Sequence, residues 1–172
     1  FEKIEDKTTE IITTQPDFNM LKIKLTDDIF YVGVNDRKTE LFENHMELPN
    51  GVSYNSYLIV DEKIALIDPV EVSFMAEFLF KIKSVIGDRK IDYLVINHDE
   101  PDHSGAVRAI VQEYPEVQVI GNAKTFAPLE SFYGPLNNKK IVAEGETLCL
   151  GKHTLQFFMV PMCHWPESMV TY

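Results

Sequence analysis

The sequence predicts an α/β (α+β) domain with two kinds of sheet region. In the middle of the chain, short apolar strands alternate with segments of helical spacing, which is the pattern of β–α–β units. On either side of that middle, strands follow one another directly, as they do in antiparallel hairpins. At 172 residues, of which 45% are hydrophobic and 25% charged, the chain is long enough for one domain with a sizeable core.

The N-terminal part is predicted to be rich in strands. Leu21 to Leu25 alternates apolar and polar residues and favours a strand, and Ile29 to Val34 is a second β-rich run. A polar segment with proline and glycine, residues 47–51, predicts a turn. Tyr57 to Val60 and Ile64 to Ile67 then form a predicted hairpin.

The predicted helices and strands alternate from here onward. Asp68 and Pro69 open the first predicted helix, and Gly87 ends it. The apolar residues between them follow helical spacing: Met75, Phe78, Leu79, Ile82, Val85 and Ile86. The remaining predicted elements are a strand at 91–96, a helix at 105–114, a strand at 117–120, a helix from Asn122 to Tyr133, and strands at 141–143, 148–150, 154–160 and 169–172.

Composition excludes several classes of function. The formal net charge of -11 argues against nucleic acid and against an anionic membrane surface, because both attract basic proteins. No apolar run is long enough to span a membrane and no signal peptide is recognisable. The two cysteines, Cys149 and Cys163, form no C-x-x-C pair, which suits a reducing, cytoplasmic location.

The two ends of the sequence suggest a piece of a longer protein. Phe1 is predicted not to be the translated start, and residues 1–19 are predicted to be an extension outside the domain. The last predicted strand runs into Tyr172, and an apolar edge strand at a chain end is typical of a fragment.

The most informative stretch is Asn97 to Gly105. It carries two histidines and three carboxylates in six consecutive positions, directly after an apolar strand, where α/β folds collect ligands. A short turned loop would direct His98 and Glu100 one way and Asp102 and His103 the other, giving two neighbouring metal positions. Such ligands suit iron, manganese or zinc, and the share of carboxylate favours redox iron. A solvated polar loop is the alternative, which mutual repulsion of the acids disfavours.

His164 is a further candidate ligand because it follows a predicted strand and the turn residue Pro161, although a lone histidine is more often structural. The neighbouring Cys163 is predicted to be a small buried residue. Asp99, which lies between two candidate ligands, is predicted to face outward. His45 and His153 are predicted to have no functional role.

These residues resemble a known family. The pattern H-x-E-x-D-H, from His98 to His103, is similar to the metallo-β-lactamase motif with glutamate in place of its second histidine, the variant found in flavodiiron proteins, also called A-type flavoproteins. The resemblance covers about residues 20–172. It includes Tyr31 to Arg37, Leu41 to Glu43, Gly51 to Ile59, Ile96 to Gly105, His164 to Pro166, and Ser168 with Met169.

The resemblance implies the N-terminal portion of a metallo-β-lactamase-like αββα sandwich with two non-haem irons. By resemblance, His98, Glu100 and His164 bind one iron, and Asp102 and His103 bind the other. The family also uses a bridging aspartate and a further histidine, both expected after the last residue of this chain. FMN is expected to bind to a flavodoxin-like domain or subunit that is absent from this chain.

The resemblance also implies an activity. Family members reduce dioxygen to water, nitric oxide to nitrous oxide, or both, with electrons passed from a rubredoxin or similar donor through FMN. They form head-to-tail homodimers or higher assemblies, so the chain needs the remainder of the protein for turnover. One alternative is a zinc hydrolase of the broader fold, against which Glu100 argues. Another is a metal-free scaffold, against which the five retained ligands argue.

Overall fold

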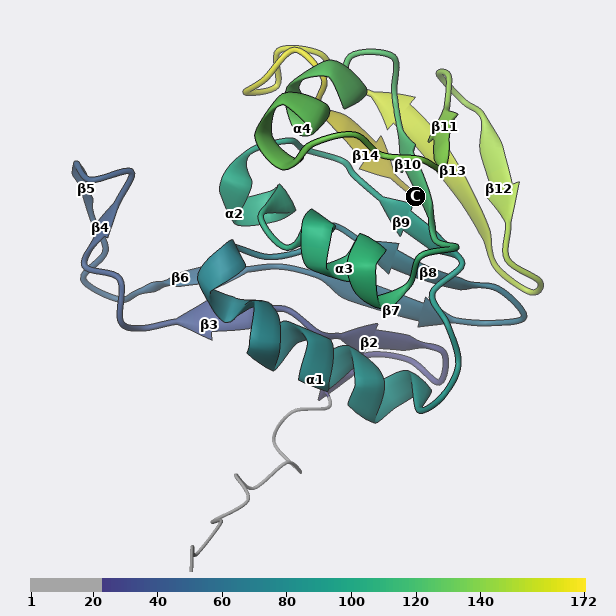
Figure 1. Ribbon diagram of the computed structural model, residues 1–172, viewed down its shortest axis with the longest axis horizontal. Coiled ribbons are helices and arrows are strands. Elements are labelled where there is room, and N and C mark those ends of the chain that lie inside the picture. Colours follow the sequence, from purple (N-terminus) through teal and green to yellow (C-terminus); the bar gives the residue numbers. More distant parts are fainter. Residues whose placement is uncertain (1–22) are drawn as a thin grey trace, which may run out of the picture.

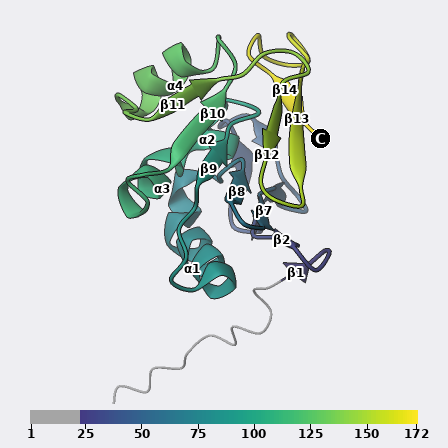
Figure 2. The same cartoon turned by 90° about the vertical axis from the view of Figure 1, so that its right-hand side faces the viewer.

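The computed structural model describes residues 23–172, so the predictions for residues 1–19, for the start of the domain at residue 20 and for Leu21 and Lys22 lie outside the described residues. Three layers are visible in Figures 1 and 2: helices, a central sheet, and a second, smaller sheet. Helices α1, α3 and α4 lie against one face of the central sheet, and β12, β13 and β14 lie against the other. This is the order of layers expected for part of an αββα sandwich.

The elements have the following bounds. The central sheet has the order β1 (Ile23–Lys24), β2 (Ile29–Tyr31), β7 (Tyr57–Val60), β8 (Ile64–Ile67), β9 (Tyr93–Val95), β10 (Gln118–Gly121) and β11 (Lys139–Ile141). The second sheet contains β12 (Thr147–Cys149), β13 (Thr154–Met159) and β14 (Met169–Thr171). Two further pairs are β3 (Val34–Asp36) with β6 (Val52–Tyr54), and β4 (Leu41–Phe42) with β5 (Met46–Glu47). The helices are η2 (Val72–Phe74, 3-10), α1 (Met75–Ile86), α2 (Pro101–Ser104), α3 (Val107–Glu113) and α4 (Phe126–Tyr133).

The central sheet changes character half-way across. From β1 to β8 the strands pair antiparallel, and from β8 to β11 they pair parallel. The predicted hairpin is confirmed, with Tyr57 opposite Ile67 and Val60 opposite Ile64. Parallel neighbours need crossover connections, which α1, α3 and α4 help to provide here. The parallel half brings the carboxyl ends of β8 and β9 together at one edge.

The central strands are apolar on both faces because both faces are covered. Leu66 and Leu94 pack into the core beneath the helices, whereas Ala65 and Val95 pack into the core between the two sheets. Phe157 of β13 is fully buried in the second core. Strands buried on both faces read as continuous apolar runs rather than alternating ones, which is the pattern of Ile64 to Ile67.

Several predicted boundaries were wrong, including the strand predicted at 141–143, which is β11 at Lys139–Ile141. The run from Ile29 to Val34 is split between β2 and β3, which belong to different sheets. The helix predicted to open at Asp68 begins later, at Met75, because the chain first makes the 3-10 turn η2, whose Ser73 N–H donates to the Glu71 carboxylate at 2.7 Å. The end of α1 at Gly87, which has φ 60°, is confirmed.

Another wrong boundary concerns the segment before α3. The predicted helix at 105–114 begins at Val107, and the stretch predicted as a turned loop contains the separate helix α2. Likewise, α4 begins at Phe126, and Asn122 stabilises the turn before it by accepting a hydrogen bond from the Lys124 N–H at 2.9 Å. Short helices of one turn carry too few apolar residues to produce a periodic signal.

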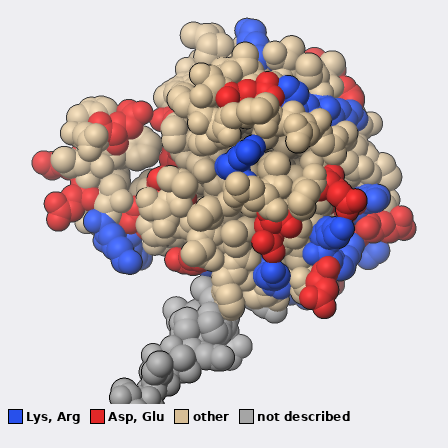
Figure 3. Space-filling view, in the orientation of Figure 1, with Lys and Arg blue, Asp and Glu red and all other residues tan. Residues whose placement is uncertain are grey.

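Surface charge is mixed on the face shown in Figure 3, where basic residues are interspersed with acidic ones. Ion pairs of the described residues include Lys83 with Glu113 at 2.8 Å and Lys90 with Glu116 at 2.7 Å. Between residues 23 and 172, no helix has the length and apolar character needed to cross a membrane.

Gly105 allows α2 to approach the segment before η2. A Cβ at this position would lie 2.7 Å from both the Pro101 carbonyl oxygen and the Val72 nitrogen, which are backbone atoms that cannot rotate away. We therefore expect Gly105→Ala to lower the free energy of unfolding by about 1–3 kcal/mol, as overpacking usually does. Urea unfolding of the parent and the variant measures this difference, and equal stability would contradict the close approach.

Candidate metal centre

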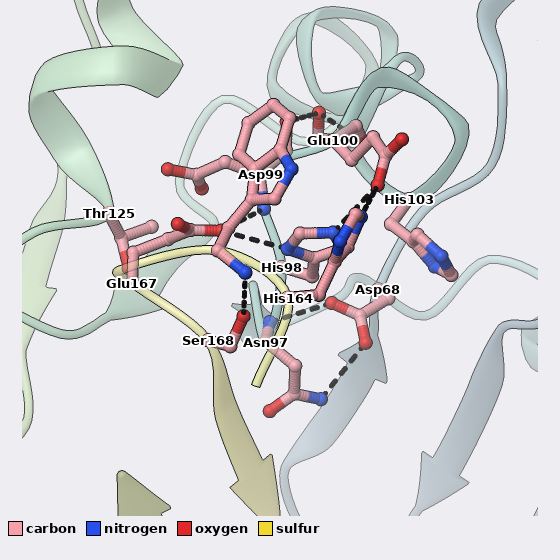
Figure 4. A network of polar contacts seen from close by, with 12 residues as sticks. Asp68, Asn97, His98, Asp99, Glu100, His103, Thr125, His164, Glu167 and Ser168 are labelled. Atoms are coloured by element: carbon pink, nitrogen blue, oxygen red, sulfur yellow. Dashed lines mark hydrogen bonds and ion pairs between the residues drawn. The ribbon is translucent and has the colours of Figure 1, made fainter. Parts of the chain in front are cut away.

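The candidate site lies at the carboxyl end of β9, next to the start of β14. Asn97, the residue before His98, holds the backbone beneath it in place through hydrogen bonds on both sides. The Asn97 backbone N–H and side-chain amide donate to the two oxygens of Asp68 at 2.7 and 2.9 Å. On the other side, the Thr171 hydroxyl donates to the Asn97 side-chain oxygen at 2.7 Å, and the Met169 N–H donates to its carbonyl at 3.0 Å. Asn97 thus joins both sheets directly below the candidate ligands (Figure 4).

His98, Glu100 and His164 converge on one point. The Nε2 atoms of His98 and His164 lie 2.9 and 2.7 Å from the same oxygen, Oε2 of Glu100 (Figure 4). One possible ligand atom from each of the three residues lies within 4.8 Å of the others. Glu100 is buried, whereas the His164 side chain is 63% exposed. Atoms arranged in this way are able to surround one cation.

The backbone around His164 is held in an uncommon conformation. His164 has φ 87° and Met162 has φ 63°, a region that residues other than glycine seldom adopt. The turn is closed by the Met162 N–H, which donates to the Trp165 carbonyl at 3.0 Å. Residues in such conformations cluster at ligand-binding positions, where the surrounding structure compensates for the strain. Here the turn directs the His164 ring toward Glu100.

Asp102 and His103 lie beside this triplet on α2. The His103 Nε2 atom is 3.2 Å from Oδ2 of Asp102, and the His103 ring centroid is 5.4 Å from that of His98. The other carboxylate oxygen, Oδ1 of Asp102, is buried and has no hydrogen-bond partner. Buried polar atoms usually have a hydrogen-bond partner. A buried carboxylate oxygen that lacks one and lies near several imidazoles is therefore a candidate ligand for a second metal ion.

The acidic groups differ in their electrostatic setting. Burial by itself would raise the pKa of Glu100, but hydrogen bonds from His98 and His164 outweigh it and lower that pKa. Burial raises the pKa of Asp102, although the nearby His103 acts in the opposite direction. Glu100 is therefore the carboxylate that two imidazoles hold in its charged form, which is the form that binds metal.

Two predictions about neighbouring residues were wrong. Asp99 does not face outward but is fully buried, and neither of its carboxylate oxygens has a hydrogen-bond partner. Burial, followed by the charges of Glu167 and Asp68, raises its pKa to about 8. Cys163 is exposed rather than buried, because the turn around His164 projects away from both cores. In each case the fold, and not the local sequence, decided the direction of the side chain.

Sequence reasoning also missed two acids at this site. Glu167 is 3% exposed, and its Oε1 atom lies 2.8 Å from Nδ1 of His98. Asp68 supports Asn97, as described above. Each acid had a weak signal in the sequence. Glu167 lies three residues after the candidate ligand His164, and Asp68 directly follows the buried strand β8. By contrast, His45 and His153 lie outside the ligand triplet. His45 contacts the Glu43 carbonyl, and His153 contacts the Asp61 carboxylate.

The donor set fits a transition-metal centre. It contains three imidazoles, two candidate carboxylate ligands and no thiolate within the described residues 98–103 and 164, which suits iron, manganese or zinc. The unpartnered oxygen of Asp102 and the oxygen of Glu100 that two imidazoles contact are both suited to bind a cation.

Comparison with known proteins finds similar sequences over most of this chain. A family model described as "ODP family beta lactamase" matches residues 52–172. A curated protein named nitric oxide reductase, from Moorella thermoacetica, is 40% identical over 152 residues, which are 87% of this chain and 38% of that protein.

Solved structures with the same fold are also found. The rubredoxin oxygen:oxidoreductase of Desulfovibrio gigas superposes with a TM-score of 0.83 at 38% identity, covering 88% of this chain and 38% of that one. A flavodiiron protein from Giardia intestinalis has a TM-score of 0.83 at 33% identity, covering 88% of this chain and 37% of that one. The chain therefore spans less than two fifths of the length of these relatives.

Proposed function

Since this chain belongs to the ODP family of beta-lactamase-like proteins, we propose that it supplies part of the diiron centre of a flavodiiron oxidoreductase. His98, Glu100 and His164 hold one iron, and Asp102 and His103 contribute to the second. Residues 20–172 form this part of the lactamase-like domain, and residues 1–19 are an extension. The remaining ligands and the FMN domain come from the remainder of the protein.

The observation that carries the proposal is the convergence of two imidazole Nε2 atoms on one carboxylate oxygen, that of Glu100. Glutamate at this position makes the set richer in carboxylate than an all-histidine zinc site. Carboxylates stabilise the higher oxidation state of iron, while imidazoles retain the ferrous form. This balance suits a metal that changes its oxidation state, so an oxidoreductase is favoured over a hydrolase.

The residues around the ligands suit small substrates. When bound, the two irons would supply electrons and Lewis acidity to dioxygen or nitric oxide at adjacent positions. A cavity of about 280 Å³ reaches Glu100 and Asp102 and is also lined by Tyr54, Leu41 and Phe42. Its size is sufficient for a diatomic molecule, and its lining mixes these side chains with the polar Thr39, Ser73 and Glu71.

The electron supply is proposed from the names of the relatives. One of them is a rubredoxin oxygen:oxidoreductase, and others are named flavodiiron protein, so a rubredoxin-type donor and FMN are the proposed route. A head-to-tail homodimer, or a higher assembly, would bring the flavin of one subunit beside the irons of the other. Reduction of dioxygen to water and of nitric oxide to nitrous oxide are the proposed reactions.

The test is the metal content of the purified chain with two matched histidine variants. After anaerobic loading with Fe²⁺ and removal of excess metal, the parent should retain at least about one iron per chain, because one triplet is complete. His98→Ala should lose it, whereas His45→Ala, which changes an exposed histidine outside the site, should retain it. Retention of zinc in preference to iron, together with esterase activity, would favour the hydrolase. Absence of any retained metal would contradict both.

A further inference from the structure

We propose that Glu167 is a positioning residue of the metal centre: it holds the proton of His98 on Nδ1 and thereby directs the Nε2 lone pair to the metal position. The inference rests on the proposed function, because it concerns how one ligand of that centre is prepared. It assigns a role to a residue that lies outside the ligand motif.

The contacts of Glu167 fix His98 from the side opposite Glu100 (Figure 4). Its Oε1 atom lies 2.8 Å from the His98 Nδ1 atom and accepts the backbone N–H of Asp99 at 3.0 Å. One oxygen therefore binds both the ring of the ligand and the backbone of the next residue. Because the side chain is 3% exposed, water competes weakly for these bonds.

Glu167 is itself anchored to another part of the fold. Its carbonyl oxygen accepts a hydrogen bond from the side-chain amide of Asn122, which lies in the turn before α4. It is separated from His164 by a turn in which the Trp165 N–H donates to the Ser168 hydroxyl at 3.3 Å. Glu167 therefore connects the segment that carries His164 with the segment that carries His98, although 66 positions separate these histidines in the sequence.

The chemistry requires a group of this kind. A neutral imidazole carries one proton, and the nitrogen that keeps the proton determines which nitrogen is free to bind a metal. In the metal-free chain the His98 Nε2 atom also faces a carboxylate, Oε2 of Glu100 at 2.9 Å, so two acids compete for the imidazole proton. By accepting from Nδ1, Glu167 favours the tautomer whose Nε2 lone pair is free to bind a cation placed between His98 and Glu100, and it makes Nε2 a stronger ligand. The Trp165 ring lies 5.2 Å from the His98 ring at an angle of 84°, and this contact restrains rotation of the His98 imidazole about its side-chain bonds. His98 is thus held in both tautomer and orientation.

Two measurements test this role. Proton–nitrogen NMR spectra of the metal-free and Zn²⁺-loaded chain report whether His98 Nδ1 carries a protected proton, independently of iron. Anaerobic Fe²⁺ titration followed by the fluorescence of Trp165, the only tryptophan of this chain, reports affinity. The variants are Glu167→Ala and Glu167→Gln, with Glu116→Ala and Glu116→Gln as controls at an exposed glutamate.

We expect the protected Nδ1 proton in the parent and its loss in Glu167→Ala, together with a fall of about 10–100-fold in Fe²⁺ affinity. Glu167→Gln retains a carbonyl acceptor, so it should keep the proton and recover part of the affinity, while the Glu116 variants should match the parent. An unchanged Nδ1 proton in Glu167→Ala, or an affinity within about twofold of the parent, would overturn the inference. Failure of the parent to bind Fe²⁺ would contradict the proposed function instead, and the Nδ1 proton would still decide the role of Glu167.

Discussion

Glu100→Ala is expected to lower the affinity of the chain for Fe²⁺ by more than about 100-fold, since loss of an outer hydrogen-bond partner alone typically costs about 10–100-fold. The reason is geometric: both the His98 and the His164 Nε2 atoms lie within 2.9 Å of the one oxygen that this substitution removes. Without that oxygen, the proposed metal position keeps the imidazoles of His98 and His164 but loses the charged ligand between them.

Tryptophan fluorescence measures the effect directly, because the Trp165 ring lies 5.2 Å from the His98 ring and 6.1 Å from the His164 ring. Glu116→Ala is the matched control, since it removes an exposed glutamate whose partner is Lys90. Circular dichroism of each variant separates loss of a ligand from loss of the fold. Affinity in Glu100→Ala within about tenfold of the parent would remove Glu100 from the ligand set.

Glu100→His extends the same test to the type of metal. This substitution restores the second histidine of the zinc-dependent members of the fold, and it removes a carboxylate that stabilises oxidised iron. We expect the ratio of Zn²⁺ to Fe²⁺ affinity to rise relative to the parent. Competition between the two metals for the chain gives that ratio without reference to any activity.

Asp99→Ala is expected to stabilise the metal-free chain by about 1–3 kcal/mol at pH 7, the cost of a buried polar group without a partner. Asp99 is fully buried, and both of its carboxylate oxygens lack a hydrogen bond. Most substitutions of a buried residue lower the free energy of unfolding. An increase on substitution of Asp99 is therefore a strict test of whether its buried carboxylate lacks partners.

The pH dependence has a defined sign. Burial raises the pKa of Asp99 from 3.8 to about 8 in the folded chain. Between those values the unfolded chain has released the proton and the folded chain retains it, so the free energy of unfolding falls as pH rises through this window. Above about pH 8 both states are ionised and the full cost remains.

Urea unfolding of the metal-free chain at several values from pH 4.5 to 8.5 measures this window. The stability gained by Asp99→Ala should be small at the acidic end and should grow toward pH 8, where Asp99 ionises in the folded chain. Asp88→Ala, which changes an exposed aspartate, should show the pH dependence of the parent. A parent and an Asp99→Ala variant with parallel pH profiles would show that this carboxyl group titrates normally.

The elements that were predicted correctly are those whose signal is local. The hairpin of β7 and β8 was predicted to the residue because two apolar runs of strand length flank one short polar turn. The end of α1 at Gly87 was predictable because helices commonly end at a glycine, the residue that most easily adopts the positive φ found there. The boundaries that were missed, at η2 and α2, belong to single turns that carry too few apolar residues to produce a periodic signal.

The same division applies to the candidate site. The spacing of His98, Glu100, Asp102 and His103 is contained in six consecutive residues, so the sequence by itself predicted imidazole and carboxylate ligands and a transition metal. It also determined the α/β class, because strands that alternate with helical segments form β–α–β units, whereas the layered sandwich was expected from the resemblance.

Only the tertiary structure decided which more distant residues join that motif. The second sheet brings His164 to within 2.7 Å of Glu100 and places Glu167 behind His98, across a separation in sequence that no local pattern spans. The fold also buries Asp99 and exposes Cys163, the reverse of what their neighbours suggested. The physical reason is that ligand type is a property of individual side chains, whereas burial, orientation and pKa depend on the surfaces that the fold packs around them.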